Sequence, residues 1–191
     1  MATTAIDLLA PVYRLSVEQY ERMAEAGVFD EGPRVELIDG IVVEVSPQNE
    51  PHFTALAWLN KHLVPQLDPA HILMPQLPAR MPSLRSMPEP DVWVLEEALI
   101  RDAEPFPLLV IEVADSSLGI DHVTKARLYA RRGVADYWIV DVRAGAVEVH
   151  REPSGERWGE RTTHGPDTTL RPLLLPGVEV DVGALLAFAA G

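Results

Sequence analysis

Two carboxylates in the middle of the chain are placed where they could hold a metal ion. Asp91 directly follows Pro90 and opens an apolar segment, and Glu112 lies inside an otherwise aliphatic run from Leu109 to Val113. A bare carboxylate among aliphatic side chains is costly to bury unless a cation or hydrogen-bond donors compensate it. A divalent metal shared with Asp91 would compensate Glu112, and hard oxygen ligands of this kind suit Mg²⁺.

A lysine completes this candidate group. Of the 16 basic side chains in the sequence, only Lys61 and Lys125 are lysines, and all the others are arginines. Lysine offers a compact ammonium instead of a planar guanidinium, so a lysine at 125 indicates a place that needs a point charge. Such a charge could stabilise a reacting phosphate or position an attacking water. The simpler alternative is a solvated lysine on a helix surface.

Simpler roles stay open for the acids as well. Glu112 could form a salt bridge with an arginine at the end of its strand, and Asp91 could be a turn or capping carboxylate. Motifs of other chemistries are missing from the sequence: it contains no G-x-S-x-G, no phosphate-binding loop, no G-x-G-x-x-G and no H-x-x-x-H pair.

Apolar spacing and turn residues predict the elements that must position these groups. Helices are predicted over residues 16–27, 50–67, 121–132 and 182–189, and strands over 33–38, 41–46, 71–78, 91–95, 106–114, 135–142 and 145–152. Asp39-Gly40 predicts a hairpin turn, because both central residues of the favoured turn need a positive φ. The region 154–176 is predicted to be rich in turns, with weak strand signals. This order predicts a mixed α/β (α+β) fold in a single domain over residues 1–191.

The composition is that of a globular protein without disulfides or thiolate metal sites. Hydrophobic residues make up 47% of the chain, charged residues 24%, and there is no cysteine. We expect a cytoplasmic protein, because neither a secretory signal nor an apolar stretch of about 20 residues is recognisable. A net charge of -13 disfavours a protein that coats nucleic acid through phosphate contacts. It allows an enzyme whose carboxylates recruit Mg²⁺.

Five stretches of the sequence follow one another in a distinctive order. They are RVELIDGIVVEVSP, PEPDVWVL, LLVIEVADSS, DHVTKARLYARRGVADYWIVD and AVEVHRE. In this order they resemble the Uma-type restriction endonuclease family of the PD-(D/E)XK nuclease superfamily, over roughly residues 16 to 151. The resemblance implies a restriction-endonuclease-like core, with a central mixed β-sheet flanked by helices, and a Mg²⁺-dependent site for phosphodiester hydrolysis.

The resemblance also assigns roles to individual residues. Pro90-Asp91 corresponds to the PD motif, and Glu112 corresponds to the second acid. Ala114 stands where the superfamily's lysine would follow, and the Uma type implies that Lys125 of the next helix takes that role. Glu36 matches an acidic position that joins the metal site. The catalytic set is therefore Asp91, Glu112, Lys125 and Glu36, of which the three acids would be metal ligands.

Five further positions are matched or adjacent. Asp39 is explained by its turn, while His52 could contact phosphate or water near the metal or simply cap its helix. Asp115, Ser116 and Ser117 follow the Glu112 strand and could orient a ligand or the acids.

These observations lead to one main expectation and two alternatives. The main expectation is a Mg²⁺- or Mn²⁺-dependent endonuclease that acts on nucleic acid, with DNA as the favoured substrate. It would form a homodimer, for which Val147 and Val149 offer hydrophobic edges. The first alternative is a dimeric structural or regulatory protein that retains the nuclease fold without turnover. The second is an unrelated acid–base hydrolase, because two carboxylates alone do not define a substrate.

Overall fold

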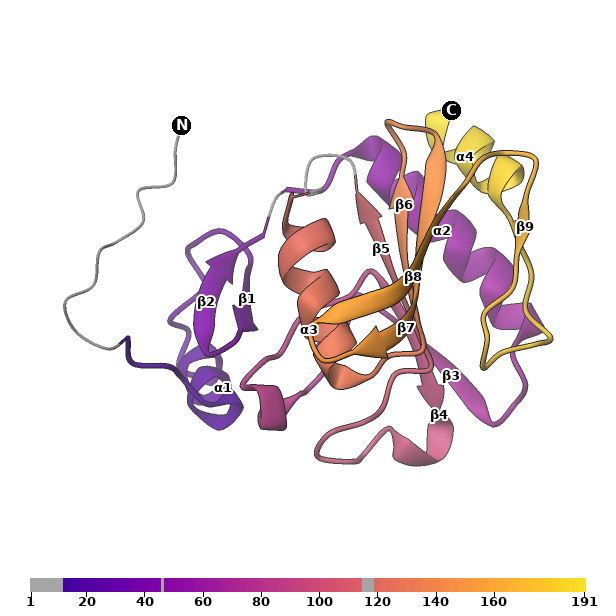
Figure 1. The fold of residues 1–191 in the computed structure, drawn as a ribbon. Helices are drawn as coiled ribbons and strands as arrows, with labels where there is room; N and C mark the ends of the chain where they lie inside the picture. Colours follow the sequence, from indigo (N-terminus) through magenta and orange to yellow (C-terminus); the bar gives the residue numbers. More distant parts are fainter. Residues whose placement is uncertain (1–11, 46, 115–118) are drawn as a thin grey trace.

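A six-stranded mixed sheet forms the centre of the computed structural model, which describes residues 12–45, 47–114 and 119–191 (Figure 1). Its strands follow the order β3 (His71–Pro75), β4 (Val92–Glu96), β5 (Leu109–Ala114), β6 (Asp136–Asp141), β7 (Ala146–Ser154) and β8 (Arg157–His164). Neighbouring strands are antiparallel, except for the parallel pair β5 and β6. The prediction of a central mixed sheet flanked by helices is confirmed.

Helices cover both faces of this sheet (Figure 1). One face packs against α2 (Glu50–Leu63) and α4 (Val182–Ala190), and alternate residues of β4, β5 and β7 contribute to that apolar layer. The other face packs against α3 (Ala126–Arg132), with the hairpin of β1 (Val35–Ile38) and β2 (Ile41–Glu44) beyond it. Because successive strand residues point to opposite faces, the even positions 110, 112 and 114 of β5 face the α3 side.

The hairpin and the helix before it follow from local sequence signals. The Ser16 hydroxyl oxygen accepts a hydrogen bond from the Gln19 backbone N–H, and the Gln19 side-chain oxygen accepts one from the Ser16 backbone N–H, so a capping box begins α1 (Val17–Glu25). Asp39 and Gly40 form the predicted turn with φ of 51° and 75°. Gly40 is needed there, because an added Cβ would lie 2.7 Å from Arg14 Cβ and 2.9 Å from the Leu15 carbonyl oxygen.

The helix that carries Lys125 differs from the uniform helix predicted over 121–132. A π-helical segment, η4 (Ile120–Lys125), precedes α3, and Gly133 ends the helix with a φ of 80° as predicted. π-Helical turns often occur at functional sites, because the wider turn shifts the side chains that follow. Here the change from π to α geometry falls at Lys125 itself.

Two expectations for the C-terminal half are wrong. The turn-rich region contains an eight-residue strand, β8, in which Trp158 is the one buried side chain. Its other side chains are exposed or half-buried, so the alternation that predicts strands is missing. Val147 and Val149 are not exposed edges: they are buried within β7, and β8 forms the sheet edge beyond them. They therefore offer no surface for dimerisation.

The remaining elements are short. They are η1 (Val64–Gln66), η2 (Pro82–Leu84), η3 (Glu97–Leu99), β9 (Thr169–Leu170) and β10 (Val180–Asp181). In the part of the chain that the structure describes, no helix is both long enough and apolar enough to cross a membrane.

Candidate active site

The first two site residues lie side by side where β4 begins and β5 approaches its end. β4 and β5 pair antiparallel with Val92 opposite Ile111, and continuing this register places Asp91 opposite Glu112. Opposite residues of antiparallel strands project from the same face, which here is the α3 side. Asp91 is held in place by the backbone N–H of Val113, which donates to Oδ2 at 2.8 Å.

Glu112 is buried between two donors from the following helix. Its Oε1 lies 3.1 Å from Lys125 Nζ and accepts a hydrogen bond of 2.9 Å from the Tyr129 hydroxyl. Lys125 and Tyr129 are four residues apart, which places them on the same side of the helix. Burial raises the pKa of Tyr129 well above its ordinary value, and the nearby Glu112 carboxylate raises it further. Tyr129 therefore stays protonated and donates to Glu112.

Glu36 reaches the same ammonium from the hairpin. Its Oε1 lies 3.2 Å from Lys125 Nζ, and the side chain is 2% exposed. Burial raises the pKa of Glu36 above its ordinary value, whereas Lys125 and a hydrogen bond with the Glu89 backbone oppose that shift, and the negative charge of Glu89 adds to it. Within the described residues, Glu36 Oε1 has no hydrogen-bond partner of good geometry. The cost of burying the Glu36 carboxylate is thus only partly compensated.

Asp91 is surrounded by groups from two other elements. His52 Nε2 lies 3.0 Å from Asp91 Oδ1, and Gln76 Nε2 donates to the same oxygen at 3.4 Å. His52 belongs to the first turn of α2, which Asn49 caps by accepting from the His52 backbone N–H. The N-terminus of a helix carries partial positive charge, so α2 favours an anion at this position. Among the described residues, His52 Nδ1 has no hydrogen-bond partner.

The structure therefore brings together residues that are far apart in the sequence. Glu36, Asp91, Glu112 and Lys125 come from β1, the start of β4, β5 and η4, and each is at most 6% exposed. His52 lies in the same cluster, which favours the site interpretation over simple helix capping. Asp115, Ser116 and Ser117 lie outside the described residues.

Two neighbouring positions show what the sequence could and could not indicate. Asp39 has the turn role predicted for it, and its carboxylate pairs with Arg131 at 2.5 Å. Gln76 was not anticipated. It follows β3 directly, and the antiparallel register of β3 with β4 brings it to Asp91. Only knowledge of this strand pairing, and no local motif, could have identified Gln76.

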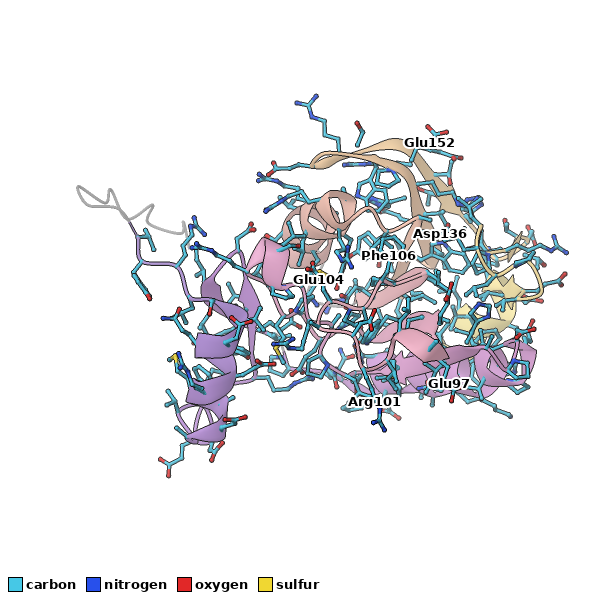
Figure 2. All side chains as sticks on the ribbon, turned by 90° about the horizontal axis from the view of Figure 1, so that it is seen from below. Glu97, Arg101, Glu104, Phe106, Asp136 and Glu152 are labelled. Carbon is cyan, nitrogen blue, oxygen red and sulfur yellow. The ribbon has the colours of Figure 1, made fainter. Side chains whose placement is uncertain are left out.

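The basic run from Lys125 to Arg132 does not form one basic surface. Lys125 points into the site, whereas Arg127 pairs with Glu156 and Arg131 pairs with Asp39. Arg132 donates to the Glu104 carbonyl oxygen and lies 5.1 Å from the centre of the Phe106 ring. Glu104 and Phe106 are labelled in Figure 2. The four basic side chains therefore contact four different parts of the molecule.

A different buried acid shows what a purely structural carboxylate looks like in this chain. Asp136, labelled in Figure 2, is fully buried at the start of β6. It accepts from Trp138 Nε1 at 3.0 Å, from Arg151 Nε at 2.6 Å and from the Leu173 backbone N–H at 2.5 Å. A planar guanidinium and two neutral donors satisfy it, whereas Glu36 and Glu112 share the one Lys125 ammonium.

The charges in the cluster leave room for a further cation. Glu36, Asp91 and Glu112 can carry three negative charges, and Lys125 contributes one positive charge. Buried charge of this kind is costly unless it is paired. In the described residues, however, no three Asp, Glu, His or Cys side chains are already arranged as a group of metal ligands.

Comparisons with known proteins bear on this arrangement. A family model, Uma2, described as "Putative restriction endonuclease", matches residues 17–183. The chain is also similar to a solved structure described as a putative nuclease of the DUF820 family from Anabaena variabilis, with 18% identity and a TM-score of 0.69. That match covers 94% of this chain and 99% of the other. No curated protein matches.

Proposed function

Because the chain belongs to the Uma2 family, whose model spans residues 17–183, we propose that it is a metal-dependent endonuclease that hydrolyses phosphodiester bonds of DNA. The observation that carries this proposal is the buried cluster in which Lys125 lies 3.1 Å from Glu112 and 3.2 Å from Glu36, with Asp91 opposite Glu112. Carboxylates can hold a metal ion, and an ammonium beside them can stabilise the negative charge that develops on a reacting phosphate.

The residues of the cluster fit a divalent cation in donor type and in charge. Mg²⁺ and Mn²⁺ prefer oxygen ligands, and Mg²⁺ uses only one or two carboxylates while keeping several waters. Asp91 and Glu112 supply such a pair from adjacent strands. Three carboxylates, one ammonium and one divalent cation sum to zero charge, so the cation would remove the excess negative charge. The described residues contain no group of three side chains already arranged as metal ligands, and a site that uses two protein carboxylates and several waters does not require one.

Each residue of the proposed site has a separate task. Asp91 and Glu112 would hold the cation, and Glu36 would complete or orient its shell from the hairpin. A bound cation would polarise the phosphate and lower the pKa of a coordinated water. Lys125 would stabilise the charge that develops on the phosphate and position the attacking water, because its ammonium is fixed between Glu36 and Glu112. Tyr129 would keep Glu112 oriented by its hydrogen bond.

The proposal is tested by incubating supercoiled plasmid with the purified protein and Mg²⁺ or Mn²⁺. We expect nicking that requires the metal, stops with a chelator and is lost in Asp91→Ala. Glu97→Gln is the matched acidic control, because Glu97 is exposed on η3. Equal cleavage by wild type and Asp91→Ala would overturn the assignment of this site.

One observation favours a second candidate function. Lys125 already lies between two of the proposed ligands, and the described residues contain no ready group of three metal ligands. A structural or regulatory protein that retains the nuclease fold without turnover would have this arrangement. The two candidates differ in calorimetry with Mn²⁺. The endonuclease binds the ion at this site with a heat that Asp91→Ala abolishes, and the silent protein gives no such heat.

A further inference from the structure

A second cluster of charged residues lies at the far end of the same hairpin and helix. Arg14, Arg85 and Arg131 line an open hollow of about 440 Å³, together with Asp39, Ser83 and Leu84. The size lies in the range of ligand sites, but the lining is polar where small-molecule pockets are mostly apolar. Three guanidinium groups and one carboxylate give the lining a net charge of +2, in a chain whose net charge is -13.

The arginines differ in how much of their hydrogen-bonding capacity is used. Arg131 pairs with the Asp39 carboxylate, and Arg14 donates to the Asp39 carbonyl oxygen. Each uses part of the five N–H donors that a guanidinium offers. Among the residues that the structure describes, the side chain of Arg85 has neither a hydrogen bond nor an ion pair, and it is exposed. Donors thus remain available around the hollow.

The walls of the hollow are fixed by hydrogen bonds of the hairpin turn. The Gly40 N–H donates to the Arg85 carbonyl oxygen at 2.7 Å, and the Asp39 N–H donates to Ser86 Oγ at 2.9 Å. Arg85 itself adopts a left-handed conformation, with a φ of 47°. These contacts hold the loop that carries Arg85 against the hairpin turn, so the hollow exists before any ligand binds.

Two elements connect the hollow to the proposed active site. Glu36 and Asp39 are three residues apart on the hairpin, which corresponds to about 10 Å along a strand. Lys125 and Arg131 are six residues apart, which corresponds to about 9 Å along a helix. Neighbouring phosphates of one DNA strand lie farther apart than the axial spacing of about 3.4 Å, because the strand winds around the helix axis, so the separation matches a phosphate one or two nucleotides away.

We infer that Arg14, Arg85 and Arg131 form a binding site for a phosphate group of the nucleic acid backbone, one or two nucleotides from the bond that is cleaved. Guanidinium groups suit phosphate because their parallel N–H donors can bind two oxygens at once. This inference rests on the proposed function, since it takes the substrate of that site to be a polynucleotide. It also resolves how a chain with a charge of -13 could hold DNA, namely through a local basic hollow.

The inference is tested by binding a fluorescein-labelled DNA duplex to the full chain in EDTA, which prevents cleavage, over a series of NaCl concentrations. Arg85→Gln is the informative variant, because its side chain has no described partner to lose. We expect Kd to rise several-fold, and the slope of log K against log salt to decrease by about one phosphate contact. Arg101, labelled in Figure 2, is also exposed, so Arg101→Gln serves as the matched control and should bind like wild type.

The outcomes separate this inference from the proposed function. Unchanged affinity and salt slope in Arg85→Gln would overturn the inference, even if the protein cleaves DNA. Weaker binding by Arg85→Gln in a protein that never cleaves with Mg²⁺ or Mn²⁺ would support the phosphate site and overturn the hydrolytic function. Inorganic phosphate tests for a free anion as the ligand: if it stabilises wild type but not Arg85→Gln, while DNA binding is the same in both, the nucleic acid assignment fails.

Discussion

Lys125 is the residue on which the electrostatics of the cluster depend. Its ammonium lies within 3.2 Å of Glu36 and Glu112, and its side chain is 5% exposed. Removing one partner of a buried ionic group costs more than the pair contributes, because the remaining charges stay buried without compensation. The same reasoning explains why lysine is used here although arginine is the common cation of this chain: a compact ammonium fits between two carboxylates.

We predict that Lys125→Met lowers the free energy of unfolding by about 3–5 kcal/mol in the absence of metal. The variant leaves the carboxylates of Glu36 and Glu112 without their shared cation. Urea denaturation in EDTA measures the loss, and Lys61→Met at an exposed position of α2 is the control. A loss of the same small size in both variants would contradict the central role given to Lys125.

We predict a pH-dependent difference between wild type and Glu36→Gln. The pKa of Glu36 is raised by burial, so the folded state holds this proton more tightly than the unfolded state. Its contribution to stability is full below the ordinary value of 4.5 and is lost as pH rises through the raised value. Metal-free wild type should therefore lose more stability than Glu36→Gln as pH rises above 4.5. Urea denaturation at a series of pH values measures this difference. If the free energies of unfolding of the two proteins change with pH in parallel, burial of Glu36 does not raise its pKa.

Among the elements, the β1–β2 hairpin links the two charged clusters. It carries Glu36 in β1 and Asp39 in its turn, and it is attached to the rest of the chain through Gly40. The Gly40 N–H donates to the Arg85 carbonyl oxygen, and its own carbonyl accepts from the Leu15 N–H. A substitution of Gly40 should therefore lower the stability of the fold and disturb both charged clusters.

We predict that Gly40→Ala destabilises the protein more than Gly145→Ala does. Both glycines have a positive φ, which costs about 1–3 kcal/mol for another residue. A Cβ on Gly40 would also lie 2.7 Å from Arg14 Cβ, whereas one on Gly145 would meet nothing within 4 Å. Thermal denaturation of the two variants measures the difference. Equal losses would mean that the close approach of Arg14 is not a real constraint.

Sequence patterns predicted the structure correctly where a feature depends only on residues close together in the sequence. The Asp39-Gly40 turn, the Ser16 cap and the Gly133 end of α3 are local features, and all three are present as predicted. The polar strand β8 escaped prediction because it is an edge strand, where charged residues prevent association with other strands and remove the alternation that marks strands.

The site was predictable only in part, for a related physical reason. Asp91, Glu112, Glu36 and Lys125 could be proposed from the resemblance, but their convergence depends on pairing between distant strands. Gln76 beside Asp91 and the hollow of the three arginines depend on tertiary contacts and have no sequence motif of their own. The π-helical segment before Lys125 likewise has no signal in the apolar spacing.

At the scale of the whole molecule, metal binding at the site should raise the free energy of unfolding of this negatively charged chain. A ligand that binds only the folded state stabilises it by about 2.7 kcal/mol when its free concentration is 100 times Kd. We predict that Mg²⁺ raises the Tm of wild type and leaves that of Glu112→Gln nearly unchanged. NaCl at equal ionic strength controls for general screening of the -13 charge. If NaCl reproduces the whole shift, the effect is screening and not binding at the site.

The most direct test of the account is a crystal of the protein soaked in Mn²⁺ and measured for anomalous scattering. The account predicts a peak in contact with the carboxylate oxygens of Asp91 and Glu112, beside the Lys125 ammonium. A soaked crystal with no peak at these carboxylates, or with Mn²⁺ bound only elsewhere, would contradict it.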